Sequence, residues 1–279
     1  MTEVKSFKQK ANGVDFYCEL RGKGPTVALI PSGEGDCGSF AKVADALADE
    51  FTVFTLDMRG CSRTGRPPTW DPITPEVLAA DVAGLVKGLD LAPVSFYGCS
   101  SGGQTILALG ADYPDIVRNL MPHEAALLRD APSSNPDLPD GAEATGFLKA
   151  TCDVLAQQLG SKDAAMAALL PLFVGDQASW EALGPEFHER IGKNGKVWID
   201  LYLEPVSQRS YSAEELKKRP ITFSVGMVSP AWLVECNLRT ARRGNSEVVW
   251  FPPPCMHYPQ VSHPDLLAAH IRKYTKQYL

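Results

Sequence analysis

Residues 96–104, with the sequence FYGCSSGGQ, decide the fold class of this chain. Gly98 to Gly102 match the pattern G-x-S-x-G. They follow an apolar run typical of a buried strand and precede a helical pattern that we expect over Gln104–Asp112. A nucleophilic serine occupies a sharp strand-to-helix turn of this kind, where larger residues two positions away would collide with their neighbours. The stretch therefore predicts Ser100 as a nucleophile.

Cys99 and Ser101 flank Ser100 and are the alternative nucleophiles. Both should point away from the apex of the turn, and a cysteine nucleophile would need a base aimed at it. We expect the backbone amide of Ser101 to act as one oxyanion donor, aided by the partial positive charge at the helix N-terminus. A glycine-serine turn without chemistry is the remaining alternative, because bare G-x-S-x-G patterns often occur by chance.

Short β-rich runs alternate with longer amphipathic segments on both sides of this turn. In this order they predict an α/β fold, with a mostly parallel sheet flanked by helices. Thr74 before Pro75 is a favourable helix start, and Ser262 with Asp265 predicts the start of the last helix. The expected strands are 14–20, 26–31, 51–57, 94–98, 118–122, 221–226 and 247–251, and the expected helices are 40–50, 74–91, 104–112 and 264–278.

Residues 128–212 interrupt the alternation. A turn-rich stretch, RDAPSSNPDLPDG, is followed by several helical patterns without clear strands. Ligands of open α/β sheets bind at the carboxyl ends of the strands. We therefore expect residues 1–127 and 213–279 to form one core domain, with 128–212 inserted between two strands as a helical cap over the site.

A nucleophilic serine needs a base, and two late histidines compete for that role. His257, in PCMHYPQ, lies in the loop between the last strand and the last helix, where such a base is carried. His263, in VSHPDLL, lies at the start of the last helix and is better explained as a helix-entry residue. His188 and His270 fall in the cap and in the last helix, where we expect surface or packing roles. The sequence favours His257.

The acid that orients this histidine is expected at an unusual place. In many hydrolases with this motif an Asp follows the strand at 221–226, but the loop here is GMVSPAWLVEC and contains no Asp. Glu235 lies well inside the next helical stretch, and Asp57 is expected to brace an Arg- and Gly-containing loop. Glu124 follows the strand next to the nucleophile strand. We therefore predict Glu124 as the acid that fixes the tautomer of His257.

A second oxyanion donor is expected from the SGEG loop that follows the strand at 26–31. The backbone amide of Gly33 or Glu34 would serve, because the glycines let the chain approach closely. Donors of this type each lower the barrier by about 3–4 kcal/mol. The loop should matter nearly as much as the charged residues.

With these residues placed, the sequence resembles the fungal zearalenone lactone hydrolases over nearly its whole length, from about Asn12 to Leu279. The shared features are GCSSG, HE after the next strand, MH-aromatic-P with VSHPD near the end, and a finish like KQYL. SWEALG in the cap is similar to the family segment that carries a ligand-facing tryptophan. A glutamate acid on the earlier strand is unusual among serine hydrolases, which makes the likeness specific.

The resemblance implies an α/β-hydrolase fold and hydrolysis of a resorcylic macrolactone, zearalenone or its alcohols, through an acyl-enzyme on Ser100. It makes Trp180 a substrate contact, and Tyr258 and Glu34 are expected beside it. The opened acid is expected to lose carbon dioxide spontaneously. This sequence departs from the family at PSGEGD, where PDGLGE is usual, at Tyr258, where phenylalanine is common, and at MPHE, which replaces MCHE. The departures bear on the exact lactone and the rate.

Composition narrows the remaining classes of function. The chain has 279 residues, a formal net charge of −6 and no basic block, so nucleic acid or an anionic membrane is not expected as a partner. No apolar stretch is long enough to span a membrane, no secretory signal starts the chain, and the seven scattered cysteines suggest free thiols in a reducing, cytoplasmic setting. We expect no metal and no cofactor, a small apolar lactone as substrate, and leave a homodimer open. A generic carboxylesterase, a carbon–carbon bond hydrolase and a hydrolase-fold receptor remain alternatives.

Overall fold

The computed structural model describes residues 3–66, 71–134, 137, 139–169 and 177–279. Their strands form one eight-stranded sheet in the order β1-β2-β4-β3-β5-β6-β7-β8. The first two pairings, β1 with β2 and β2 with β4, are antiparallel, and the others are parallel. The strands are β1 Val4–Ala11, β2 Val14–Arg21, β3 Thr26–Ile30, β4 Thr52–Leu56, β5 Val94–Cys99, β6 Val117–His123, β7 Thr222–Gly226 and β8 Glu247–Phe251.

Burial explains which strands the sequence predicts well. Every residue of β3, β5 and β7 is buried, as the continuous apolar runs indicate. The missed strand is β1, which lies at the sheet edge with most of its residues exposed and three lysines along it. Lysines are common on edge strands because they discourage pairing with other chains, and they also mask the strand pattern. The prediction of an α/β fold with a mostly parallel sheet is confirmed.

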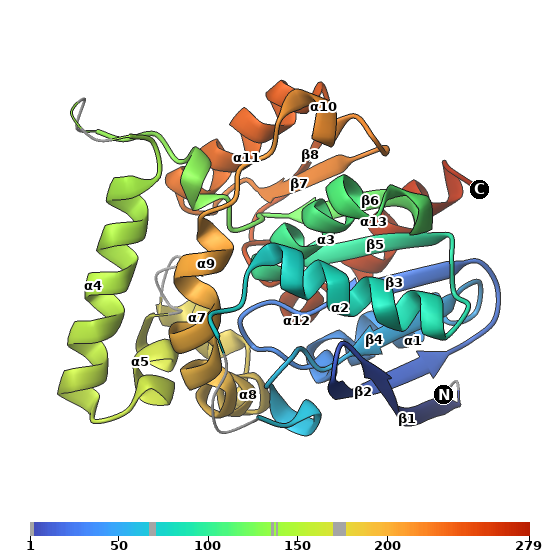
Figure 1. Cartoon of the computed structure of the whole chain (residues 1–279), viewed down its shortest axis with the longest axis horizontal. Helices are drawn as coiled ribbons and strands as arrows, with labels where there is room; N and C mark the ends of the chain where they lie inside the picture. The colour runs from blue at the N-terminus through green and yellow to red at the C-terminus, as the bar shows by residue number, and fades with distance from the viewer. Residues whose placement is uncertain (1–2, 67–70, 135–136, 138, 170–176) are drawn as a thin grey trace.

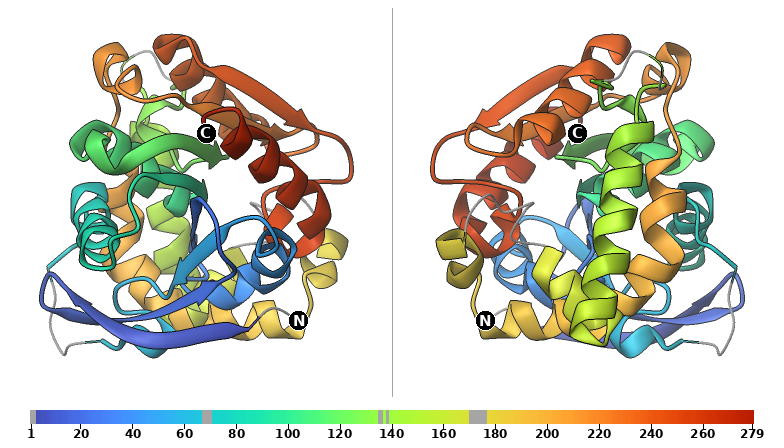
Figure 2. Two further views of the ribbon diagram at one scale, coloured as in Figure 1. Left: turned by 90° about the vertical axis from the view of Figure 1, so that its right-hand side faces the viewer. Right: turned by 90° about the vertical axis from the view of Figure 1, so that its left-hand side faces the viewer.

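Helices cover both faces of the sheet (Figure 1). On one side α1 Ala41–Leu47 packs against α13 Pro264–Lys276, and on the other α2 Pro75–Gly88 packs against α3 Ser101–Asp112. Figure 2 shows the sheet between α3 and α13. Further along the chain, α10 Ala213–Leu216 contacts α3, and α11 Ala231–Gly244 packs on β7 and β8.

The ends of three helices test the sequence signals for helix starts. Thr74 caps α2 as expected, with its side chain accepting from the amide of Val77 at 3.4 Å. α13 starts at Pro264, as expected, but Ser262 does not cap it, because His263 is the residue that precedes its first turn. Pro259 begins a separate short helix, α12 Pro259–Ser262, and the Ser262 hydroxyl donates to the Tyr258 carbonyl at 3.0 Å instead. The helix after the nucleophile turn begins earlier than expected, at Ser101.

Residues 128–212 lie between β6 and β7 and are called the helical insertion below. Their described part consists of helices joined by turns and contains no strand. Its last part contacts α3, because the Gln104 side chain donates to the carbonyls of Val206 and Arg209, each at 3.0 Å. In Figure 1 its longest helix, α4, lies at the far left, away from the sheet. Its helices are α4 Ala142–Leu159, α5 Lys162–Leu169, α7 Gln177–Ala182, α8 Pro185–Val197, the π-helix η5 Trp198–Tyr202 and α9 Leu203–Ser207, after the short turn η4 Leu128–Asp130.

All seven cysteines are buried and none forms a disulfide. In the part of the chain that the structure describes, no His, Cys, Asp or Glu side chains gather in a group able to hold a metal ion. Its helices are all too short or too polar to cross a membrane.

Candidate active site

Ser100 lies at the turn between β5 and α3 in a strained backbone conformation, with φ 54° and ψ −121°. Such a conformation costs about 1–3 kcal/mol and persists only where its surroundings enforce it. Gly98 and Gly102 are needed on either side of Ser100 because the backbone there leaves no room for a side chain. A Cβ atom on Gly98 would lie 2.4 Å from the Gly102 carbonyl oxygen, and one on Gly102 would lie 2.4 Å from that of Ile30. The turn therefore has the geometry that the G-x-S-x-G pattern predicts.

Glu124 and His257 meet at the carboxyl ends of the strands. Nδ1 of His257 donates to Oε2 of Glu124 at 2.9 Å, and the amide of Gly226 donates to Oε1 at 2.7 Å. Both side chains are almost wholly buried, with 0% and 1% exposed for the acid and the base. Glu124 itself has a positive φ of 41°, a second strained residue close to Ser100. The two residues predicted as acid and base are thus in direct contact.

Backbone contacts bring the nucleophile turn to this pair. The amide of Ser100 donates to the carbonyl of His123 at 3.0 Å, which places the turn beside the residue before Glu124. On the other side, Sγ of Cys99 donates to the carbonyl of His257 at 2.9 Å. Burial raises the pKa of the Cys99 thiol well above its usual value, so the thiol stays protonated. A protonated, fully buried thiol is a poor nucleophile, which weighs against the cysteine alternative.

The charge of Glu124 is maintained against its burial. Burial would raise the pKa of this carboxyl, but the His123 and His257 rings and the hydrogen bond from His257 lower it to about 2. His123 is itself fully buried, and burial lowers its pKa to about 4, so its ring is neutral near pH 7. That ring lies between Ser224 and the carbonyl of Met256 and stacks on Phe251. Sequence analysis assigned no role to His123, although it is part of the quoted HE pair.

The other candidates for base and acid lie elsewhere. Nδ1 of His263 pairs with the hydroxyl of Ser262 at 2.9 Å, at the entry to α13. Glu235 lies on α11 with its side chain 39% exposed and pairs with Arg239 at 3.5 Å. Asp57 accepts from Nε of Arg63 at 2.7 Å and from the amide of Cys37 at 3.1 Å. It therefore holds the loop after β4 through Arg63.

The loop after β3 packs directly against the nucleophile turn. The absent side chain of Gly102 lets this turn approach the carbonyls of Ile30 and Pro31, which lead into the loop that contains Gly33. The loop closes as a turn in which the amide of Gly35 donates to the carbonyl of Ser32 at 3.0 Å. The two residues predicted as oxyanion donors, Gly33 and Ser101, therefore belong to segments that pack together.

A row of aromatic rings connects the helical insertion with His257. Tyr258 packs on His257 with ring centroids 4.7 Å apart, and Phe187 of α8 packs on Tyr258 at 4.9 Å. Trp180 of α7 contacts Phe187 at 6.2 Å and stacks on His188 at 4.2 Å. Sequence analysis missed Phe187, and the only signal for it was an apolar position in a largely polar helix. Trp180 is 7% exposed, so most of its ring serves packing.

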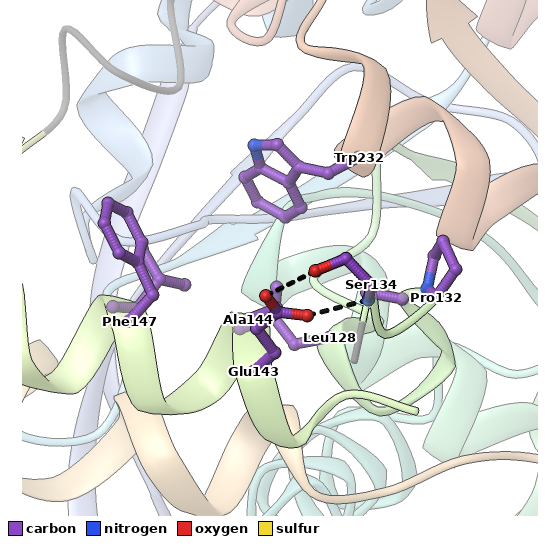
Figure 3. A pocket seen from close by; sticks show the side chains of 9 residues that line it. Leu128, Pro132, Ser134, Glu143, Ala144, Phe147 and Trp232 are labelled. Atoms are coloured by element: carbon purple, nitrogen blue, oxygen red, sulfur yellow. Dashed lines mark hydrogen bonds between the residues drawn. The ribbon is translucent and has the colours of Figure 1, made fainter. Parts of the chain in front are cut away.

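An apolar pocket of about 380 Å³ lies between α4 and the start of α11 (Figure 3). Phe147 and Trp232 extend into it from these two helices, and the Glu143 carboxylate accepts from the amide and hydroxyl of Ser134 at 2.8 and 2.7 Å. Leu128 also lines it. Two of its walls come from α4 and α11, which follow β6 and β7 in the chain. Ser100, Glu124 and His257 are not among the residues that line this pocket.

Comparisons with known proteins agree with this geometry. A family model described as "alpha/beta hydrolase fold" matches residues 25–232. The chain is 33% identical to a zearalenone hydrolase of Cladophialophora bantiana over 276 residues (96% of this chain, 95% of that protein), and 34% identical to one of Bionectria ochroleuca over 273 residues (96% of each). The fold is similar to a thermophilic esterase from Thermogutta terrifontis, with a TM-score of 0.73, 22% identity and coverage of 98% and 99% of the two chains. The chain is thus an enzyme, a hydrolase, and it belongs to the zearalenone hydrolase family of the α/β-hydrolase fold.

Proposed function

We propose that this enzyme hydrolyses the ester bond of a resorcylic macrolactone, zearalenone or its alcohol derivatives, by a Ser100-His257-Glu124 triad. The observation that carries the proposal is the 2.9 Å hydrogen bond from His257 to Glu124 at the end of β6. An acid on this strand is the feature by which the sequence resembles the family. The identity of 33–34% over 96% of the chain to two zearalenone hydrolases supports the same substrate class.

The reaction begins when Oγ of Ser100 attacks the ester carbonyl carbon while Nε2 of His257 takes the hydroxyl proton. The amides of Gly33 and Ser101 stabilise the oxyanion of the tetrahedral intermediate. The ester C–O bond then breaks, and His257 returns the proton to the departing alkoxide, which leaves an acyl-enzyme. Water attacks the acyl carbon with His257 as base, and Ser100 regains its proton. Glu124 holds the tautomer of His257 and stabilises its imidazolium throughout.

The helical insertion, residues 128–212, is proposed as the cap that shapes the substrate site. Its aromatic row from Trp180 to Tyr258 reaches the base, and an apolar substrate would be favoured by such surfaces. The pocket between Phe147 and Trp232 adds apolar surface between the helical insertion and α11. We place the nonreacting part of the macrolactone on this side of the site. In this proposal Tyr258 and Trp180 lie close to the substrate, whereas Glu34, expected beside it from the sequence, is fully buried and acts on the site only through its loop.

The substrate class is tested by comparing zearalenone with 4-nitrophenyl acetate. We expect many turnovers of zearalenone per enzyme, with a higher kcat/KM than for the short ester, because remote apolar contacts contribute binding energy in the transition state. Product formation is measured by chromatography, with Ser100→Ala as the blank. Turnover of the short ester alone would replace the lactonase by a generic carboxylesterase. Stoichiometric binding of the lactone without turnover would point to a receptor.

Trp180 is expected to contribute to substrate binding as well as to packing. Trp180→Ala should destabilise the fold by about 3–5 kcal/mol because a large buried ring is removed. Trp180→Phe keeps most of the packing and should raise KM for zearalenone while the melting temperature changes little. The matched control is Trp198→Phe, since Trp198 has the same exposed fraction of 7%. Equal KM values for both phenylalanine variants and the parent enzyme would make Trp180 a core residue only.

A further inference from the structure

The carboxyl group of Glu34 is fully buried in the loop that carries Gly33, with 0% of the residue exposed. The hydroxyl of Ser39 donates to Oε1 at 2.8 Å, and the hydroxyl of Ser32 donates to Oε2. Nε2 of Gln260 approaches Oε1 at 3.5 Å. None of the ion pairs between residues that the structure describes involves Glu34. Burial of a carboxyl group whose two oxygens are engaged only by neutral donors costs folding free energy. Such a group is therefore a candidate for a functional role.

These contacts join three separate segments at one point. Ser39 belongs to the 3₁₀ turn Cys37–Phe40, and Gln260 belongs to α12, which starts two residues after His257. The main chain of Glu34 is also held, because Nδ2 of Asn194 in α8 donates to the Glu34 carbonyl at 2.6 Å. Glu34 thus connects the Gly33 loop with the segment that carries the base and with the helical insertion.

From this arrangement we infer that Glu34 is a positioning residue, whose carboxyl group fixes the Gly33 loop relative to the His257 segment and so sets the oxyanion hole. The inference rests on the proposed function only in that Gly33 is taken as an oxyanion donor. Both carboxyl oxygens are engaged by protein groups, so the residue acts on its loop and not on the substrate. A displacement of about 1 Å at such a site can lower the rate about 100-fold.

The groups that donate to the Glu34 carboxyl are neutral, which gives it a pH signature. Burial raises the pKa of Glu34 above its usual value of 4.5. The folded protein therefore holds a proton on this group at pH values where the unfolded chain has lost it. Through this group, stability falls as pH rises from about 4.5 towards the raised pKa. The titratable groups that interact with it have raised pKa values and are also neutral: Cys61, Tyr97, Cys99 and Tyr258.

The test uses Glu34→Ala, which removes the carboxyl group, and Glu34→Gln, which keeps its shape and hydrogen-bonding capacity. With 4-nitrophenyl acetate as substrate, kcat should fall about 10- to 100-fold for the alanine variant with KM within about twofold, and glutamine should restore kcat to within about threefold. Binding of phenylboronic acid, which mimics the oxyanion, should weaken in parallel with kcat. The glutamine variant should also lack the loss of stability that the parent enzyme shows as pH rises above 4.5.

Two further variants keep the inference falsifiable. If Glu34→Ala does not fold, Ser39→Ala removes one donor to the carboxyl group and should lower kcat about 3- to 10-fold. Asp81→Asn is the matched control, because Asp81 is also a buried carboxyl group with a raised pKa, yet it pairs with Arg59 away from the loop. It should change stability and leave kcat unchanged. An unchanged kcat in the Glu34 and Ser39 variants, or equal losses for alanine and glutamine at position 34, would overturn the inference.

The short ester separates this inference from the proposed function. An oxyanion hole serves every ester, so the effect of Glu34→Ala on 4-nitrophenyl acetate does not depend on whether zearalenone is the natural substrate. Failure of zearalenone turnover alone would change the substrate class and leave the role of Glu34 standing. Normal turnover of zearalenone in a fully active Glu34→Ala enzyme would remove that role and leave the substrate class standing.

Discussion

Replacement of Ser100 by alanine is expected to lower kcat for ester hydrolysis at least about 10⁴-fold while the fold is retained. The reason is that Ser100 is the proposed nucleophile, so its loss would remove the whole proposed covalent pathway. Alanine occupies the same strained conformation as serine, so the melting temperature should stay close to that of the parent. The measurement is the burst and steady-state release of nitrophenolate, together with thermal unfolding of each protein.

Two control variants sharpen this result. Cys99→Ala should keep most of the activity, because the Cys99 thiol is buried and protonated. Ser246→Ala, at the amino end of β8 and thus opposite the site, should be indistinguishable from the parent enzyme. Substantial activity in Ser100→Ala combined with an inactive Cys99→Ala would move the nucleophile to the cysteine.

Glu124→Gln is expected to lower kcat about 10⁴-fold, close to the effect of losing the nucleophile. An amide at this position can donate to Nδ1 and so favours the wrong tautomer of His257, and it cannot stabilise the imidazolium. The matched control is Glu235→Gln, since Glu235 is the only other glutamate weighed for this role and lies half-exposed on α11. Near-full activity of Glu124→Gln together with an inactive Glu235→Gln would assign the acid to α11.

The stability that Glu124 contributes to the fold should decrease as pH falls. The neighbouring histidines lower the pKa of Glu124 to about 2 in the folded protein, against 4.5 for an unperturbed glutamate. The unfolded chain therefore binds this proton first as pH falls. Stability that Glu124 contributes is complete above about pH 4.5 and is lost between about pH 4.5 and 2. Glu124→Gln should be less stable than the parent at pH 7, and the difference should shrink over that interval.

The strands and the nucleophile turn could be predicted from sequence because each depends on local pattern. The runs that became β3 and β5 are mainly apolar because both faces of the sheet are covered, and glycine spacing marks the turn at Ser100. The choice of Glu124 needed one step more. It followed from a missing Asp after β7, combined with the rule that carboxyl ends of neighbouring parallel strands lie side by side.

Features that depend on distant partners could not be predicted in this way. Nothing in the sequence near Glu34 shows that Ser39 and Gln260 surround it, and an isolated glutamate is normally exposed. The capping signal at Ser262 failed because Tyr258 offers its hydroxyl a nearer carbonyl. Phe187 was missed because its role comes from Tyr258, more than seventy positions later in the chain. For Glu34 and Phe187 the decisive partner lies in another segment, whereas Ser262 bonds to a carbonyl only four residues earlier.

The hydrogen bond between the Ser100 amide and the His123 carbonyl bears on how the substrate preference of this enzyme can change. The amide of Ser100 donates to the carbonyl of His123, and the proposed nucleophile and acid both precede the helical insertion in the chain. Lengthening, shortening or replacing the insertion should therefore leave their mutual geometry intact, provided that His257 is brought back to them and that the contact of Asn194 with the Glu34 carbonyl is kept. If the insertion is the proposed cap, an ancestor with this layout could exchange the cap and keep its reaction. Chimaeras that carry the insertion of a relative between β6 and β7 are accordingly a direct route to new lactone preferences.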